Sequence, residues 1–169
     1  SISNVQGRNL VEKFTTKNCH NTYISKFFIR LSTRKDEEDN MKIHLFQQCL
    51  IDMFYPHVGM AGVEVLERLG CELVVPKKQV CCGQMFTNSG YNEAAMDAIK
   101  KTIECFENAD YVVSMSGSCA FAIRDEYQHF LEGQPEWQKR AEKLSGKIYE
   151  FTEFITDVLG VEDVGARFN

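Results

Sequence analysis

Residues 42–76 read KIHLFQQCLIDMFYPHVGMAGVEVLERLGCELVVP, and their strand, helix and strand pattern indicates the fold class. A first strand is predicted over residues 42–48. A helix then starts at Pro56, shows apolar residues at helical spacing, and ends at Gly70. A second short apolar strand covers residues 71–75. A helix-length connection between two strands is typical of parallel pairing, because it returns the chain to the edge of the sheet where the first strand began.

The same alternation of strands and helices continues towards the C-terminus. The further predicted elements are a helix after residues 88–90, a strand at 111–114, helices at 120–130 and 135–144, a strand near 148, and a helix at 151–159. This order predicts a Rossmann-like three-layer α/β domain. Its sheet is expected to be largely parallel, with helices on both faces.

Four cysteines lie where the predicted strands end. Cys49 follows the first strand, Cys81 and Cys82 lie in the loop after the second, and Cys119 follows the third. The carboxyl ends of parallel strands share one rim of the sheet, where sites form in open α/β folds. We therefore expect these four thiols to converge, with Gly83 letting the backbone approach whatever they hold.

Thiolates at this rim suit a soft metal. Zinc and iron–sulfur clusters fit the ligand type about equally, and an adjacent Cys-Cys pair is uncommon in simple tetrahedral zinc sites. The residues favour an iron–sulfur cluster, with zinc and a metal-free redox thiol pair as the alternatives. If Ser118 caps the third helix, Cys119 is the first helical residue, where the helix dipole stabilises a thiolate. Gly117 leaves room for a bulky ligand.

Composition limits the class of protein. The chain has 169 residues, 44% of them hydrophobic, and a net charge of -5, which fits one ordinary domain without a nucleic-acid footprint. No apolar run is long enough for a membrane span. Seven cysteines, an odd number, favour reduced thiols in the cytoplasm over a secreted disulfide framework. No Ser–His–acid set, phosphate-binding loop or dinucleotide fingerprint is present, so no catalytic residue is assigned.

The N-terminal segment has a different character. Lys and Arg dominate it, with Glu12 as the one acid before Asp36. We interpret residues 1–40 as an extension, either non-native or disordered, with a natural extension or a transit peptide as alternatives. Residues 41–169 form the domain. Cys19 and His20 are predicted to be bystanders.

The pattern Cys49, Cys81-Cys82-Gly83 and Cys119 resembles the CCG cysteine-rich domain family. This family includes the cysteine-rich subunit of heterodisulfide reductase and the iron–sulfur subunit of glycolate oxidase. From Met41 to the end, the chain resembles the lactate-utilization subfamily, and the matching segments are 49–56, 81–84, 88–91, 116–119 and 149–154.

The resemblance implies a function. It implies an iron–sulfur electron-transfer subunit of a complex that oxidises L-lactate to pyruvate. Two partner subunits are implied, one of them a ferredoxin-like iron–sulfur protein. The implied cofactor is a 4Fe-4S cluster on Cys49, Cys81, Cys82 and Cys119, with zinc as the alternative.

Two departures from the family pattern affect these expectations. Ser116 stands where the fuller motif has the first cysteine of C-x-x-C, and serine is a weak iron ligand. Family members also carry two cysteine motifs, whereas this chain ends at Asn169 before a second one. We therefore expect an N-terminal half whose partner half is missing.

Other cysteines and histidines have simpler interpretations. Cys71 opens a strand and Cys105 lies on an apolar helix face, so both are predicted to be core residues. His44 alternates within the first strand and is predicted to pack there. His57 is the histidine nearest the predicted rim, and a structural role is favoured for it.

Overall fold

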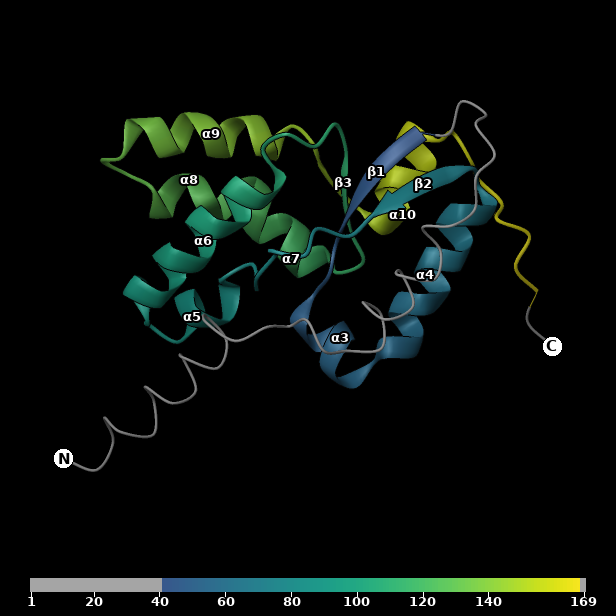
Figure 1. The fold of residues 1–169 in the computed structure, drawn as a ribbon, viewed down its shortest axis with the longest axis horizontal. Coiled ribbons are helices and arrows are strands. Elements are labelled where there is room, and N and C mark those ends of the chain that lie inside the picture. The colour runs from purple at the N-terminus through teal and green to yellow at the C-terminus, as the bar shows by residue number, and fades with distance from the viewer. Residues whose placement is uncertain (1–40, 168–169) are drawn as a thin grey trace.

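A four-stranded parallel sheet forms the centre of the structure, a computed structural model that describes residues 41–167 (Figure 1). Its strands lie in the order β2-β1-β3-β4. They are β1 (Met41–Phe46), β2 (Cys71–Val74), β3 (Val112–Ser114) and β4 (Ile148–Glu150). All three pairings are parallel, so the predicted parallel α/β sheet is confirmed.

Helices connect and cover these strands. They are α3 (Cys49–Phe54), α4 (Pro56–Arg68), α5 (Gln84–Asn88), α6 (Asn92–Phe106), α7 (Gly117–Phe121), α8 (Tyr127–Phe130), α9 (Pro135–Ser145) and α10 (Phe151–Glu153), with π-helical turns η2 (Ala122–Glu126) and η3 (Phe154–Val158). Among the described residues, none of these helices has the length and apolar character needed to cross a lipid bilayer.

Apolar side chains pack on both faces of the sheet. Phe46 and Val112 face a core that α6 and the helices from α7 to α9 complete. Ile43, Leu45 and Val113 face the other core, built with α4, α10 and η3. Figure 1 shows these two groups of helices on opposite sides of the strands. The alternation follows from the period of two in a strand, and it produces the predicted three layers.

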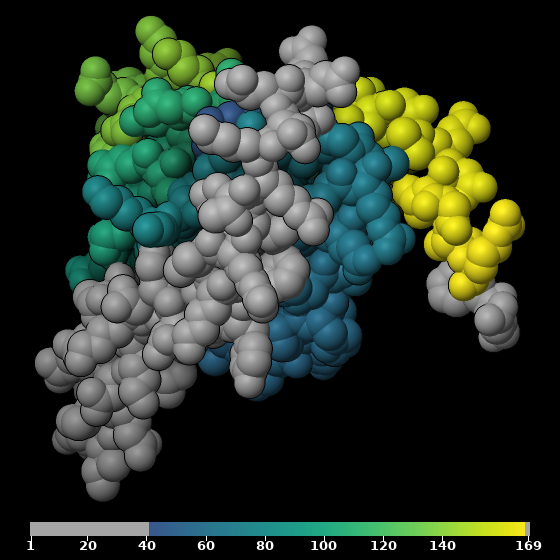
Figure 2. Space-filling model, turned by 45° about the vertical axis from the view of Figure 1, so that its right-hand side comes forward, coloured from purple at the N-terminus to yellow at the C-terminus, as the bar shows by residue number. Residues whose placement is uncertain are grey.

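The C-terminal residues lie along the second core. Val158, Leu159 and Val161 pack against the cluster that holds Val63 and Leu66 of α4. In the space-filling view, the yellow C-terminal segment lies beside the blue-green surface of α4 (Figure 2). These C-terminal apolar residues therefore help to cover the face of the sheet that lies opposite the cysteines.

The prediction missed α3. It placed no element between the first strand and Pro56, whereas residues 49–54 are helical. The helix is short, and its apolar residues do not form a buried stripe: Leu50 is 58% exposed and Phe54 is 64% exposed. Without an amphipathic period, the helix has no sequence signature. As a result, Cys49 is the first residue of a helix and not the end of a strand.

The predicted start of the third helix was also wrong. Its N-cap residue is Ser116 and not Ser118, and no side-chain hydrogen bond caps it. Cys119 is therefore the third residue of α7 and not the first. The prediction placed the helix too late because the Ser-Gly-Ser run reads as a turn.

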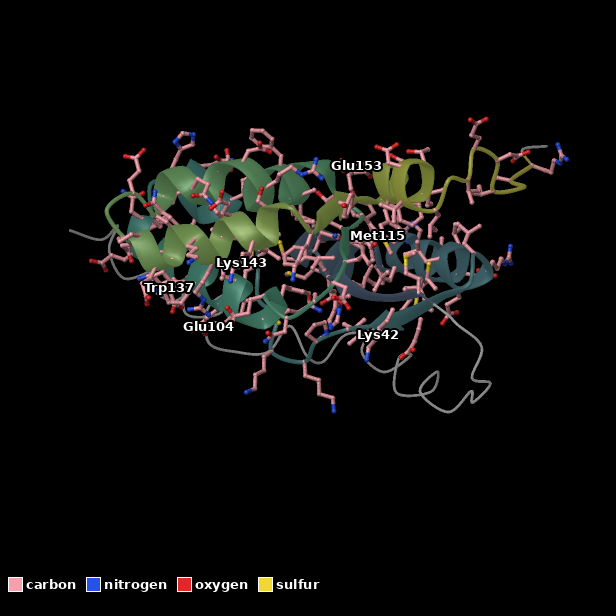
Figure 3. All side chains as sticks on the ribbon, turned by 90° about the horizontal axis from the view of Figure 1, so that it is seen from above. Lys42, Glu104, Met115, Trp137, Lys143 and Glu153 are labelled. Carbon is pink, nitrogen blue, oxygen red and sulfur yellow. The ribbon has the colours of Figure 1, made fainter. Side chains whose placement is uncertain are left out.

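An ion pair joins the helical run after β3 to the C-terminal helix. Arg124 Nη1 and Nη2 donate to the Glu153 carboxylate at 3.0 and 2.6 Å, and Nη2 also donates to the Ile148 carbonyl at 2.6 Å. Glu153 is the last residue of α10, and Figure 3 labels it. The hydrogen bond from Arg124 lowers the pKa of Glu153 from its usual value. The carboxylate therefore stabilises the fold in its charged form.

The variant Glu153→Gln is expected to lower the free energy of unfolding by about 1 kcal/mol at neutral pH. A lowered pKa contributes stability above the unfolded value, and that stability is lost as the pH falls through the folded value. The difference from the wild type should therefore begin to shrink below the ordinary glutamate pKa and vanish only below the lowered pKa of the folded protein. Urea unfolding at neutral and acid pH measures it. Glu64→Gln breaks the exposed pair with Arg68 and serves as the control, with no change expected.

Candidate functional site

The four predicted rim cysteines meet at the carboxyl edge of the sheet. β1 and β3 are central neighbours, with β2 beyond β1 and β4 beyond β3, so the strand order reverses between them. Ligand sites in open α/β sheets form at such a switch point. Cys49 follows β1, Cys81 and Cys82 follow β2, and Cys119 follows β3. Segments that are up to 70 residues apart, from 49 to 119, thus supply one site.

The four thiols form two close pairs. The Sγ atoms of Cys49 and Cys81 are 3.7 Å apart, and those of Cys82 and Cys119 are 3.5 Å apart. Cys81 and Cys82 are each 3% exposed, Cys119 is 8% exposed, and Cys49 is partly buried. Two sulfurs bound to one tetrahedral metal at about 2.3 Å lie about 3.8 Å apart. Each pair therefore has nearly the separation of two ligands on one metal ion.

The donor set fits a soft metal group. All four cysteines line one cavity of about 280 Å³. Within residues 41–167, no group of three or more His, Cys, Asp or Glu side chains is arranged to hold a metal ion as it stands. Four thiol donors around one cavity nevertheless match the ligands of zinc and of iron–sulfur clusters.

Hydrogen bonding lowers the pKa of one sulfur in each pair. The bond from Cys49 lowers the pKa of Cys81, and the same contact raises the pKa of Cys49. The bond from Cys82 lowers the pKa of Cys119, with Ser116 and Ser118 adding to the effect, while the pKa of Cys82 rises. Thiolates are the form that binds metals and attacks electrophiles. Each pair therefore holds one sulfur whose pKa is lowered by a hydrogen bond from its neighbour, and Cys82 adds to this effect at Cys81.

Ser116 and Gly83 contribute in different ways. Ser116 lines the cavity, and its hydroxyl lies 3.2 Å from that of Ser118. Gly83 has φ 90°, a left-handed conformation, and an added Cβ there would lie 3.4 Å from the Ala95 carbonyl oxygen on α6. The fold thus favours glycine at this turn because of its left-handed backbone, whereas an added Cβ would make only ordinary van der Waals contact with α6. A role in approaching a ligand remains a prediction.

Buried polar residues that the sequence analysis did not single out hold the strand ends together. Gln48 is 3% exposed, and its Nε2 donates to the Phe46 carbonyl at 2.7 Å and to Ser114 Oγ at 2.9 Å. Ser114 Oγ in turn donates to the Ser116 carbonyl at 3.0 Å. This chain ties the end of β1 to the start of α7, and so fixes Cys49 relative to Cys119. The sequence feature that could have identified them is a polar residue at or just after the end of a predicted apolar strand, Gln48 for the first strand and Ser114 for the third.

The remaining cysteines lie outside the cavity. Cys71 is buried in the core on the opposite face, and burial raises its pKa. Cys105 packs against the core on the cysteine face, and burial raises its pKa to about 11. Cys19 and His20, like the interpretation of residues 1–40, lie outside the described residues.

Neither described histidine near the predicted rim lines the cavity. His44 lies within β1. Burial is the main cause that lowers its pKa, and the positive charge of Lys42 lowers it further. Its Nδ1 is buried with no hydrogen-bond partner. His57 sits in α4 with its ring centroid 6.2 Å from that of Tyr55. The site is therefore built from sulfur, hydroxyl and amide groups.

A parallel α/β sheet with four thiols gathered at its carboxyl edge defines a cysteine-rich module, whose donor atoms are of the kind that bind soft metals or form disulfides. The family model of the cysteine-rich domain, CCG, matches residues 43–124, a segment that contains all four cavity cysteines. Residues 43–124 thus match the CCG cysteine-rich domain family.

Curated relatives agree with the resemblance read from the motifs. The chain is 58% identical to lactate utilization protein A 1 of Bacillus cereus strain AH820, over 75% of this chain and 52% of the relative. It is equally identical to lactate utilization protein A of Bacillus cereus strain G9842, over 76% of this chain and 54% of the relative. The chain thus spans about half the length of the curated relatives it matches. No solved structure matches it.

Proposed function

We propose that this chain is an iron–sulfur electron-transfer subunit of a system that oxidises L-lactate to pyruvate. The observation that carries the proposal is the gathering of Cys49, Cys81, Cys82 and Cys119 around one cavity inside the CCG segment. The link to lactate comes from the relatives, which are named lactate utilization protein A. The expected cofactor is a cluster of the 4Fe-4S type.

In this proposal the four cysteines would hold the cluster, with Ser116 as a weak additional ligand. When bound, such a cluster accepts and releases single electrons. Oxidation of lactate to pyruvate releases two electrons and two protons, and this subunit would pass the electrons on. Cys81 and Cys82 are almost fully buried, which limits the access of water to the site. No described residue is assigned to the removal of protons from lactate.

Anaerobic reconstitution of the full chain with iron and sulfide tests the proposal. The expected result is bound iron and inorganic sulfide together with broad absorbance in the blue part of the visible spectrum. Colourless protein that carries stoichiometric zinc would contradict it. That outcome would favour the alternative, a zinc-binding CCG module that serves as a structural or interaction subunit.

A second alternative is a metal-free thiol-redox module. The observation that favours it is the pairing itself, with Sγ contacts of 3.7 Å for Cys49 and Cys81 and 3.5 Å for Cys82 and Cys119. Joining a pair as a disulfide would release two protons and two electrons to an oxidised thiol acceptor. Counting free thiols after treatment with oxidised and reduced glutathione decides the matter, because unchanged counts exclude this module.

Exposed apolar side chains lie on or next to α3 and α5, two of the helices that supply residues to the cavity lining. Leu50, Met53, Phe54, Tyr55 and Met85, which we call the apolar rim, are between 41% and 64% exposed. Leu50 and Met85 also line the cavity. Large exposed apolar side chains that gather in one place are typical of interaction sites. We propose that the apolar rim binds the ferredoxin-like iron–sulfur partner, because electron transfer requires that partner to approach the cavity mouth.

The variant Phe54→Ala is expected to weaken binding of that partner by about tenfold or more, because large aromatic side chains dominate interface energies. Binding is measured by titration of the purified ferredoxin-like protein. Val164→Ala, which removes an exposed apolar side chain near the C-terminus, should leave binding unchanged. If binding persists in Phe54→Ala, and a longer protein with a second cysteine-rich half is destabilised by it, the rim is covered by that half instead.

The proposal extends to organisation and location. Residues 41–169 would form the first of two cysteine-rich domains, with the second repeat outside this chain and residues 1–40 as an extension. The support is that the chain covers 52% and 54% of the first two relatives. A cytoplasmic location would keep the cavity thiols reduced when no metal is bound.

A further inference from the structure

Two buried hydroxyl groups lie against the backbone of the paired cysteines. The Tyr127 hydroxyl donates to the Cys82 carbonyl at 2.8 Å, and Thr102 Oγ1 donates to the Cys81 carbonyl at 3.4 Å. Tyr127 is 2% exposed and Thr102 is fully buried. We propose that Tyr127 and Thr102 are positioning residues that fix the Cys81-Cys82 backbone so that both thiols face the cavity. The metal-binding purpose of that orientation rests on the proposed function.

The backbone here needs such partners. Cys81 and Cys82 lie between β2 and α5, outside any strand or helix. A buried carbonyl left without a hydrogen bond costs about 1–3 kcal/mol, so an irregular buried segment is stable only when other groups satisfy it. Thr102 on α6 and Tyr127 on α8 supply those groups from two different helices. The turn is therefore held at two successive peptide units.

The geometry of the thiols makes this support specific. Cys81 contacts Cys49 on α3, whereas Cys82 contacts Cys119 on α7. Two neighbouring side chains thus reach partners on two separate elements. A rotation of the turn that improved one contact would break the other. Fixing the Cys81 and Cys82 carbonyls by hydrogen bonds opposes that rotation.

One helical run contacts Cys82 at both its side chain and its backbone. Cys119 of α7 contacts the Cys82 sulfur, and Tyr127 at the start of α8 donates to the Cys82 carbonyl. Between them lies the π-helical turn η2, in which the Tyr127 amide donates to the Ala122 carbonyl five residues earlier. A π turn holds one residue more than an α turn, so it changes the direction of the side chains that follow. This extra residue helps to direct Tyr127 towards the cysteine turn.

Cadmium titration of the reduced full chain tests the proposal, because Cd²⁺ binds thiolates and the ultraviolet absorbance of the Cd²⁺–thiolate bond reports it directly. In Tyr127→Phe, the affinity for Cd²⁺ is expected to fall about tenfold or more, as for other residues that orient metal ligands. Thr102→Val should give a smaller loss, since its hydrogen bond is longer. The readout needs no iron–sulfur cluster, so failure of reconstitution would leave this test intact.

Tyr149→Phe is the matched control. Tyr149 packs with Tyr111 and Phe154 on the other face of the sheet. Removing its hydroxyl group should leave the Cd²⁺ affinity unchanged. A purely structural role for Tyr127 would lower the urea midpoint but not the Cd²⁺ affinity of the folded protein. Folded Tyr127→Phe with affinity within about twofold of wild type overturns the proposal. If Tyr127→Phe does not fold, the Cd²⁺ affinity of Thr102→Val becomes the test, and an unchanged affinity in that variant overturns the proposal.

Discussion

The variant Cys82→Ala is expected to lose nearly all bound iron and the associated visible absorbance after anaerobic reconstitution. Cys82 joins the two halves of the site, because its sulfur contacts Cys119 while its neighbour Cys81 contacts Cys49. Removing it leaves three thiols, of which only Cys49 and Cys81 remain paired. Iron and sulfide analysis, with the absorbance spectrum, measures the loss.

Two cysteines outside the cavity provide the controls. Cys71→Ala and Cys105→Ala each remove a sulfur that packs against a core, on opposite faces of the sheet. Both should keep the wild-type iron content of the folded protein. Full iron retention in Cys82→Ala would contradict the proposed ligand set. Equal losses in all three variants would show that the iron content reports folding and not ligation.

The strand and helix pattern was predictable where burial imposes a period. α4, α6 and α9 each bury one face, and Gly70 ends the first of them in a left-handed conformation. α3 and α5 were missed because five- or six-residue helices bury too few side chains to create a period. Their stability comes from tertiary contacts that no local pattern records.

The convergence of the cysteines followed from topology alone, since parallel strands end at one edge. The pairing of Cys49 with Cys81, and of Cys82 with Cys119, did not. It depends on which way the turn before α5 faces, and Tyr127 and Thr102 influence that direction from 45 and 21 residues away. The π turn before Tyr127 was also invisible, because a pattern search at 3.6 residues per turn assumes regular α-helix.

The largest loss of stability is expected on the face opposite the cysteines. Phe154 is fully buried, and its ring centroid lies 5.8 Å from that of Tyr111 and 5.9 Å from that of Tyr149. Phe154→Ala should lower the free energy of unfolding by about 3–5 kcal/mol, because it leaves a cavity inside a packed aromatic cluster. Urea unfolding measures the change. Phe54→Ala, which truncates a 64% exposed ring, should stay within about 0.5 kcal/mol of wild type.

This variant also separates stability from binding. Domains of this size have a free energy of unfolding of about 5–15 kcal/mol. Phe154→Ala should therefore remain mostly folded while losing a large share of that free energy. Phe154 packs on one face of the sheet, and the cavity thiols belong to the core on the other face. The Cd²⁺ affinity of its folded fraction should therefore match the wild type, in contrast to Tyr127→Phe. A matching loss of affinity would mean that packing behind the sheet controls the cysteine turn, and that the support from Tyr127 is not local.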